Sequence, residues 1–306
     1  MNFLFIGLGS IATKHIIDLF KITSNQNIEC NISVLRRNIK ELPKELFSYE
    51  VKQITELDST FYDVVFITNP TNLHYNSLFS LKDKASFYFI EKPIFEKLDY
   101  PWNVLNIHEK NSYIACPMRH MKVYRELKNI VKSNDVFSSR IICSSYLPDW
   151  RPNVDYRNNY SAIKNLGGGV TLDLIHEMDY MVDLFGMPKK IVNIHGKYSD
   201  LEIDSDDLSV YIAQYNDKLC EVHLDYFGRK LQRTCELYSQ KGTYIADFNE
   251  CVIKLPNGNV IDCKETRSDI YSEMEWFVNF IQGKNKINLN PPELAINVLK
   301  LAIGEN

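Results

Sequence analysis

A glycine-rich loop between an apolar run and a helical pattern constrains this chain more than any other feature. Residues 2–6 read NFLFI, which is typical of a strand buried on both faces. The loop GLGSIA at residues 7–12 follows at once, and residues 11–20 then have helical spacing. The loop has the form G-x-G-x-x-A in the strand–helix context that a dinucleotide site requires.

Each position of this loop has a physical reason. Gly7 permits the tight turn, Gly9 lets the backbone approach a pyrophosphate, and the small Ala12 lets helix and strand pack closely. Ser10 and Ile11 open the helix, whose free N–H groups favour phosphate oxygens. We therefore expect these five residues to bind a dinucleotide; a plain tight turn is the alternative.

Strand and helix signals alternate over about the first 115 residues. The expected strands are 32–35, 63–68, 86–93 and 113–116, and the expected helix is 72–82. Such alternation predicts an α/β fold with a doubly wound parallel sheet, the Rossmann arrangement. We place this domain at residues 1–118.

The character of the chain changes after Pro117. Helices are expected at 120–132, directly after the glycine triplet 167–169, at 269–282 and at 291–303. A strand is expected at 141–146, and several short alternating strands are expected between 190 and 262. Alternation with short turns predicts an α+β domain with a large, mainly antiparallel sheet. We assign residues 119–306 to it, with the last helices as candidates to pack back on the first domain.

Two arginines follow the second expected strand. An NAD enzyme usually has a carboxylate there for the ribose 2′-hydroxyl, whereas this chain has Arg36 and Arg37. Guanidinium groups suit a 2′-phosphate, so the residues favour NADP over NAD. Ordinary surface charges are the alternative.

Candidate catalytic side chains occur in two places. Glu91-Lys92-Pro93 closes the expected strand 86–93, at the sheet edge where doubly wound folds bind ligands, and Lys92 could take part in proton transfer there. His176 lies three residues after Asp173, so on one helix they would share a face, and Asp179 could contribute from it. A surface lysine and a histidine packed at a domain interface are the alternatives.

Composition excludes several classes. The chain has 306 residues, 45% of them hydrophobic and 24% charged, with a net charge of −4 and no dense basic block, so no nucleic-acid partner is expected. No apolar run approaches the ~20 residues of a membrane span, and no signal peptide is evident. Seven scattered cysteines without a Cys-x-x-Cys pair predict free thiols and a cytoplasmic protein. Tyr180 stands where a zinc-binding His-Glu-x-x-His motif would need its second histidine, so no metal is predicted.

Taken together, these segments resemble the glucose–fructose oxidoreductase and inositol dehydrogenase family, Gfo/Idh/MocA. The resemblance rests on GLGSIATKH (7–15), ITNPTNLH (67–74), EKP (91–93), PMR (117–119) and GGGVTLDLIHEMDY (167–180), and it extends over the whole chain. It implies that Lys92 lies at the hydride-transfer site, with His176 as the catalytic histidine and Asp173 as its partner. His15 and His74 would match the family's GxGxxGxxH and TPxxxH positions.

The resemblance also implies ligands and partners. We expect Asn69, Pro70, His74, Glu91 and Lys92 to help bind NADP or NAD, and sugars, cyclitols or their derivatives to be substrates. Many family members are dimers or tetramers that associate through the open face of the second sheet. The chain departs from the pattern in two places: Asn69 replaces a threonine, and the Asp173–His176 spacing is three instead of four.

The block at residues 146–169 resembles a subgroup found with enzymes of surface-glycan sugar synthesis. We expect the substrate to contact six residues in or near it, namely Arg119, Trp150, Arg151, Tyr156, Arg157 and Asp179. The loop aromatics packing on the sheet are the alternative. The predicted activity is oxidation or reduction at a CH–OH group; the alternatives are an NAD-dependent glycosidase of the same fold and a non-catalytic dinucleotide-binding regulator.

Overall fold

The computed structural model of the protein describes residues 1–304. The chain forms two compact units. The first unit consists of residues 1–117 and 267–296, and the second contains residues 118–266 and the segment that begins at residue 297. The first unit is therefore built from two separate stretches of chain.

A six-stranded parallel sheet forms the centre of the first unit. Its strands are β1 (Asn2–Ile6), β2 (Asn31–Leu35), β3 (Val51–Ile54), β4 (Tyr62–Ile67), β5 (Ala85–Ile90) and β6 (Ser112–Ile114), in the order β3-β2-β1-β4-β5-β6. The order reverses between β1 and β4. In such sheets ligands bind outside the carboxyl ends of the strands, at this reversal.

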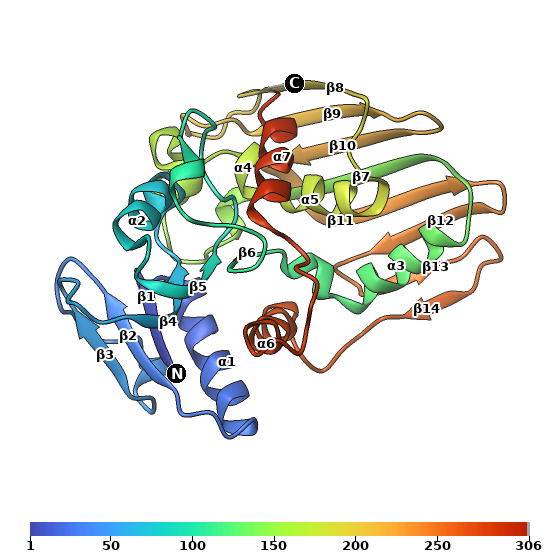
Figure 1. The fold of residues 1–306 in the computed structure, drawn as a ribbon. Helices are drawn as coiled ribbons and strands as arrows, with labels where there is room; N and C mark the ends of the chain where they lie inside the picture. The colour runs from blue at the N-terminus through green and yellow to red at the C-terminus, as the bar shows by residue number, and fades with distance from the viewer. Residues whose placement is uncertain (305–306) are drawn as a thin grey trace. The chain divides into compact units, whose positions relative to one another are not determined.

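Helices cover the sheet of the first unit. They are α1 (Ser10–Asn25), α2 (His74–Leu81) and α6 (Asp269–Ile281), with the 3₁₀ turns η1 (Lys44–Leu46), η2 (Thr71–Leu73) and η3 (Trp102–Val104). Figure 1 shows α6 beside α1, against which it packs. Phe277 of α6 lies against Phe66 and Phe89 of the sheet, with ring centroids 5.9 and 5.1 Å apart. The last part of the chain thus completes the core of the first unit.

An eight-stranded mixed sheet forms the second unit. Its strands are β7 (Val136–Tyr146), β8 (Lys190–Gly196), β9 (Leu208–Gln214), β10 (Leu219–Asp225), β11 (Phe227–Ser239), β12 (Gly242–Asp247), β13 (Val252–Lys254) and β14 (Val260–Asp262). Their order is β14-β13-β12-β11-β7-β10-β9-β8. β7 and β10 are parallel, and the other neighbouring pairs are antiparallel.

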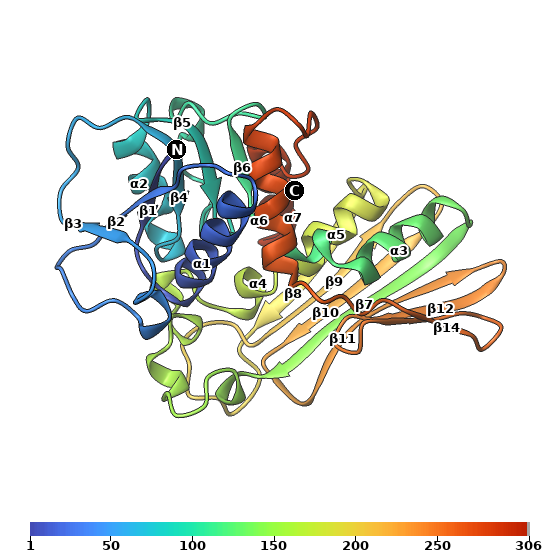
Figure 2. The same cartoon turned by 90° about the horizontal axis from the view of Figure 1, so that it is seen from below.

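Helices pack on one face of this second sheet. The helices are α3 (Lys122–Lys132), α4 (Val170–Asp173) and α5 (His176–Phe185); α7 (Pro292–Ala302) ends in this unit, and the 3₁₀ turns are η4 (Pro117–His120), η5 (Leu147–Asp149), η6 (Tyr156–Asn158), η7 (Tyr160–Ala162) and η8 (Lys164–Leu166). Figure 2 shows α3 and α5 lying along the sheet. Buried Tyr211 and Ala213 alternate with exposed Ile212 in β9, so one face is covered and the other is open.

The predicted fold class is confirmed: a parallel Rossmann sheet precedes a mainly antiparallel one. The sequence analysis missed β3, which spans four residues. It was wrong to expect one continuous helix after the glycine triplet, because α4 ends at Asp173 and α5 begins at His176. Among residues 1–304, no helix is long and apolar enough to cross a membrane.

Candidate functional site

The glycine loop leaves open space in front of α1. Gly7 has φ +90°, and a Cβ there would lie 3.3 Å from Cα of Asn69. At Gly9 a Cβ would meet nothing within 4 Å, and both Gly9 and Ser10 are exposed. The N-cap residue of α1 is Gly9, which has no side chain to cap the first N–H groups of the helix. This loop fits a pyrophosphate, because it offers room and donors together.

The end of β2 carries the two predicted arginines. Arg36 is partly buried, and its Nη1 donates to Oε1 of Gln53 at 2.9 Å. Arg37 is exposed. The guanidinium of Arg36 is therefore held against β3, whereas that of Arg37 extends into solvent.

The β4–α2 connection is joined to the turn after β5 by His74. The imidazole is buried; its Nε2 lies 3.0 Å from the carbonyl oxygen of Asn69, and its Nδ1 lies 3.2 Å from that of Ile94. Burial lowers the pKa of His74, although both carbonyls act in the opposite direction. Pro70 is exposed at the edge of this connection. Both ring nitrogens face the protein, while the assignment of these residues to cofactor binding stays a prediction.

Glu91 and Lys92 directly follow β5. The Nε2 of His15 lies 2.6 Å from Oε1 of Glu91, whose side chain is 15% exposed. Burial would raise the pKa of Glu91, but the hydrogen bond and charge of His15, together with Lys92 and His74, outweigh it and lower the pKa. Lys92 is partly exposed, and the Lys92–Pro93 peptide bond is cis. The lysine thus stands just beyond the carboxyl end of β5, the edge at which doubly wound sheets bind ligands.

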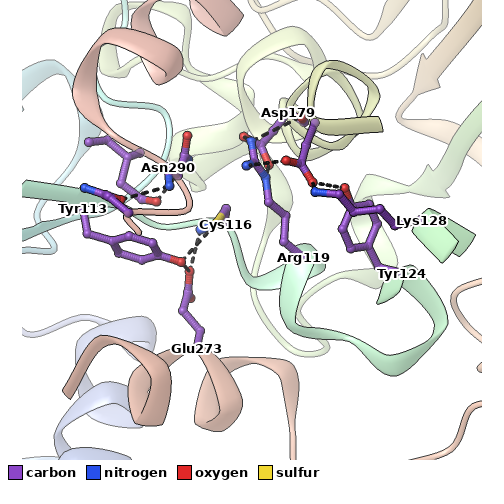
Figure 3. A network of polar contacts seen from close by, with 11 residues as sticks. Tyr113, Cys116, Arg119, Tyr124, Lys128, Asp179, Glu273 and Asn290 are labelled. Atoms are coloured by element: carbon purple, nitrogen blue, oxygen red, sulfur yellow. Dashed lines mark hydrogen bonds and ion pairs between the residues drawn. The ribbon is translucent and has the colours of Figure 1, made fainter. Parts of the chain in front are cut away.

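A buried carboxyl group that the sequence analysis missed lies nearby in the same unit. Oε1 of Glu273 in α6 accepts hydrogen bonds from the Cys116 backbone N–H at 2.5 Å and from the Tyr113 hydroxyl at 2.9 Å, as Figure 3 shows. Burial raises the pKa of Glu273 well above its ordinary value, and the charge of Glu91 adds to this effect. A charged residue on the apolar face of a predicted helix was the available signal.

One residue stands out in the α4–α5 region of the second unit. Every residue from 170 to 182 is buried except His176, which is partly exposed at the first position of α5. Buried neighbours hold the backbone on both sides, while the imidazole reaches the surface.

Asp173 is held by two tyrosines. Its Oδ2 accepts from the Tyr226 hydroxyl at 2.5 Å, and its Oδ1 accepts from the Tyr160 hydroxyl. The expectation that it shares a helix face with His176 is wrong, because α4 and α5 are separate helices. Its role as the partner of His176 stays a prediction.

The glycine triplet is surrounded by the protein's own groups. A Cβ on Gly168 would lie 2.7 and 2.8 Å from the carbonyl oxygens of Ser161 and Ile163, and closer still to that of Tyr160. Gly169 has φ +123° and meets the carboxylate of Asp206 in the same way. The groups that approach these glycines closely are therefore backbone carbonyls and the aspartate that accepts from the Thr171 N–H.

The predicted substrate residues Arg119 and Asp179 pair with each other. Nε and Nη2 of Arg119 donate to the two carboxylate oxygens of Asp179 at 2.8 and 2.7 Å (Figure 3). Nη1 of Arg119 lies 3.2 Å from Oδ1 of Asp183. Burial raises the pKa of Asp179 even though Arg119 opposes the shift. Both side chains are buried, so a role in substrate contact stays a prediction beside this structural one.

The other predicted substrate residues lie in the loop after β7. Nε1 of Trp150 donates to Oγ of Ser145 at 3.0 Å. Arg157 pairs with Asp155 at 2.9 Å and with Glu202 at 3.0 Å. Arg151 is exposed, and Tyr156 is partly exposed and accepts from the Glu202 backbone N–H at 3.1 Å. Their contact with a substrate stays a prediction.

Comparison with known protein families identifies both halves of the chain. Residues 1–118 match the NAD-binding Rossmann fold of the Gfo/Idh/MocA oxidoreductase family, and residues 124–245 match the C-terminal domain of the same family. The chain belongs to the Gfo/Idh/MocA family. This assignment confirms the resemblance found in the sequence, and it makes the chain a member of an oxidoreductase family.

Solved structures share this fold at low sequence identity. UDP-N-acetylglucosamine 3-dehydrogenase GnnA from Acidithiobacillus ferrooxidans is 16% identical, with a TM-score of 0.77 over 100% of this chain and 96% of GnnA. An oxidoreductase from Thermotoga maritima is 18% identical, with a TM-score of 0.81 over 100% and 95%. The WlbA dehydrogenase from Bordetella pertussis, in complex with NADH and UDP-GlcNAcA, is 13% identical, with a TM-score of 0.75 over 99% and 94%. No curated protein sequence matches.

Proposed function

We propose that this Gfo/Idh/MocA protein is an NAD(P)-dependent dehydrogenase or reductase that acts on a CH–OH group of a sugar, a sugar derivative or a nucleotide-sugar. The observation that carries the proposal is His176, the one partly exposed side chain of an otherwise buried stretch from 170 to 182. A protein that only senses a nucleotide has no need for an imidazole held in this way. The Rossmann unit supports the same function through its open glycine loop.

The residues divide the chemical work between the two units. When bound, the nicotinamide ring supplies the acceptor or donor of hydride. Gly7, Gly9 and the N-terminus of α1 hold the pyrophosphate. Lys92 and His176 are the proposed partners of the reacting hydroxyl: His176, or Lys92 acting with it, takes its proton in oxidation and returns it in reduction. Asp173 positions the loop that faces the substrate through its two tyrosine contacts.

Replacing Lys92 tests the proposal directly. Lys92→Met is expected to lower turnover on the true substrate by about 10²–10⁴-fold, the usual contribution of a positioned acid or base. The dissociation constants of NADPH and NADH, measured by fluorescence titration, should change by less than about threefold because the pyrophosphate contacts remain. Full activity of Lys92→Met would refute the catalytic assignment, and a wild-type protein that binds neither dinucleotide would refute the function.

The cofactor preference is proposed to be NADP. Arg37 is exposed just after β2, and the neighbouring Arg36 is hydrogen-bonded to Gln53. The two planar guanidinium groups could both donate hydrogen bonds to a 2′-phosphate. Arg37→Ala should weaken NADPH binding by about tenfold, the value of one charge-assisted contact, and leave NADH binding unchanged. Wild-type preference for NADH would contradict this part of the proposal.

The substrate class is proposed from the loop and from the relatives. GnnA is a dehydrogenase of UDP-N-acetylglucosamine, and the WlbA structure contains UDP-GlcNAcA. The loop after β7 presents exposed Arg151 and Trp150, the latter 36% exposed. The guanidinium suits a diphosphate or a carboxylate, and the aromatic face suits a sugar ring. We propose a nucleotide-linked amino sugar as the first substrate to assay.

A second copy of the chain is the proposed partner. The open face of the second sheet exposes Val192, Ile194 and Ile212 by 49, 62 and 39%, and Val192 pairs with Ile212 across β8 and β9. A homodimer or homotetramer would cover them. The cytoplasm is the proposed location, because all seven cysteines are free thiols.

A further inference from the structure

We propose that His15 is a positioning residue that acts through Glu91: it fixes the carboxyl end of β5 and with it the side chain of Lys92. This inference rests on the proposed function, in which Lys92 takes part in proton transfer. The geometry itself lies entirely within the first unit and depends on two helices, one strand end and one buried ion pair.

The imidazole of His15 is buried in the core of the first unit. It is 1% exposed, and it lies on the buried face of α1 between Ala12 and Ile16. Its ring packs edge-on against Phe89 at a centroid distance of 5.1 Å and lies 6.4 Å from the ring of Phe66. Aromatic packing of this kind leaves the imidazole one orientation.

The polar contact of this ring is directional. An ionised carboxylate can only accept hydrogen bonds, so Nε2 of His15 donates to Oε1 of Glu91 across 2.6 Å. Nδ1 is buried and has no hydrogen-bond partner among the described residues, so Nε2 makes the polar contact of the ring. The donor is thus committed to Glu91, the residue before Lys92.

The pair connects two parts of the candidate site. α1 begins at the glycine loop, and Glu91 follows β5, which is separated from β1 by β4. The His15–Glu91 contact therefore passes over β4 and joins the cofactor-binding helix to the strand end that carries the lysine. His74 holds the same turn from the other side through the carbonyl of Ile94. The charges of His15, Lys92 and His74 lower the pKa of Glu91, and the charge of Glu91 raises the pKa of Glu273.

Three variants separate positioning from general support of the fold. His15→Leu removes the donor, while His15→Gln returns an N–H near the position of Nε2. Thr23→Val is the matched control, because Thr23 is a buried polar residue of the same helix whose hydroxyl donates to carbonyls of α1. Circular dichroism melts of all three establish which variants are folded.

The first measurement is the acylation rate of Lys92 in the cofactor-free protein, quantified by peptide mass spectrometry over a pH series. In His15→Leu the released Glu91 carboxylate can pair with the neighbouring ammonium, so labelling should slow by about threefold or more, equivalent to half a pKa unit. His15→Gln and Thr23→Val should label at the wild-type rate. Unchanged or faster labelling in folded His15→Leu would overturn the inference.

The second measurement is turnover, with Glu91→Gln added to form a double-mutant cycle. His15→Leu should lower kcat by about tenfold, leave the dinucleotide dissociation constants within about twofold, and be non-additive with Glu91→Gln. Additive losses, or a loss that His15→Gln fails to restore, would contradict positioning. A wild-type protein without any turnover would refute the proposed function, while the labelling result would still decide the role of His15.

Discussion

Two glycines of this chain show how differently the same residue type is used. At Gly9 an added methyl group meets empty space, whereas at Gly168 it meets three backbone carbonyl oxygens. The first glycine keeps room for something outside the protein. At Gly168 the protein's own backbone fills the space, and unlike the G-x-G-x-x-A motif around Gly9, no motif in the sequence indicates which groups lie there.

Gly168→Ala should therefore destabilise the second unit severely. Backbone carbonyls cannot rotate away as a flexible side chain does, so the chain must shift, and the cost should reach about 3 kcal/mol or more. Differential scanning calorimetry checks this expectation. Gly9→Ala is the matched control, which should keep the wild-type melting temperature while binding NADPH more weakly; equal melting of both variants would contradict the steric argument.

Glu273 makes a prediction about pH. Burial and the charge of Glu91 raise the pKa of Glu273 in the folded protein. Its contribution to the free energy of unfolding is therefore fully present below the unfolded pKa, and it is lost as the pH rises through the folded pKa. Glu273→Gln keeps an acceptor for Cys116 and Tyr113, and it cannot ionise. Its apparent Tm at neutral pH should rise by about 2–4 °C, the effect of ~1 kcal/mol.

The control for this prediction is Glu275→Gln on the same helix. Glu275 is 38% exposed and pairs with Arg267, so its replacement should change Tm little. The difference between Glu273→Gln and wild type should shrink as pH falls toward the ordinary value of a glutamate. A difference that grows on acidification would show that Glu273 is ionised in the folded protein.

At the scale of elements, regular structure could be predicted where periodicity was strong. The runs that became β1, β4 and β5 were read correctly because both faces of each strand are buried. β3 was missed because its four residues include none that is fully buried, so no apolar run marks it. The α4–α5 break was missed because every apolar position around it is buried, and burial on all sides carries no period.

The candidate site follows the same division. The glycine loop, Lys92 and His176 could be found because each is a short motif at a predictable strand or helix end. The partners of Asp173 could not: Tyr160 and Tyr226 lie 13 and 53 residues away, and only tertiary structure brings their hydroxyls to one carboxylate. Pairings of this kind depend on packing and leave no local pattern.

Tyr160 should anchor the 3₁₀ turns η6 to η8 to α4. In Tyr160→Phe the hydroxyl is lost and the ring stays, so the fold should persist while the loop at 156–166 opens more often. Hydrogen exchange followed by mass spectrometry should show about tenfold faster exchange there, equal to ~1.4 kcal/mol of local stability. Tyr244→Phe, whose hydroxyl contacts Asn134 elsewhere in the second unit, is the control and should leave this loop unchanged.

At the scale of the whole molecule, the open sheet face predicts association. Ile194→Glu should shift the protein toward monomer, because an exposed apolar residue at a self-association surface becomes a repulsive carboxylate in each copy. Analytical ultracentrifugation measures the shift. Ile287→Glu, at an isoleucine that is 74% exposed in the first unit, should leave the assembly intact. A monomeric wild-type protein would contradict the proposed partner.

The route of the chain has a consequence for synthesis on the ribosome. Residues 1–117 emerge first, yet part of the apolar surface around Phe66 and Phe89 is covered by Phe277 and its neighbours in α6. That part of the nascent Rossmann sheet therefore stays exposed to solvent while about half of the polypeptide is still being translated, and a chaperone could bind it during this period. A fragment that ends near residue 117 would lack α6, so this apolar surface would remain exposed.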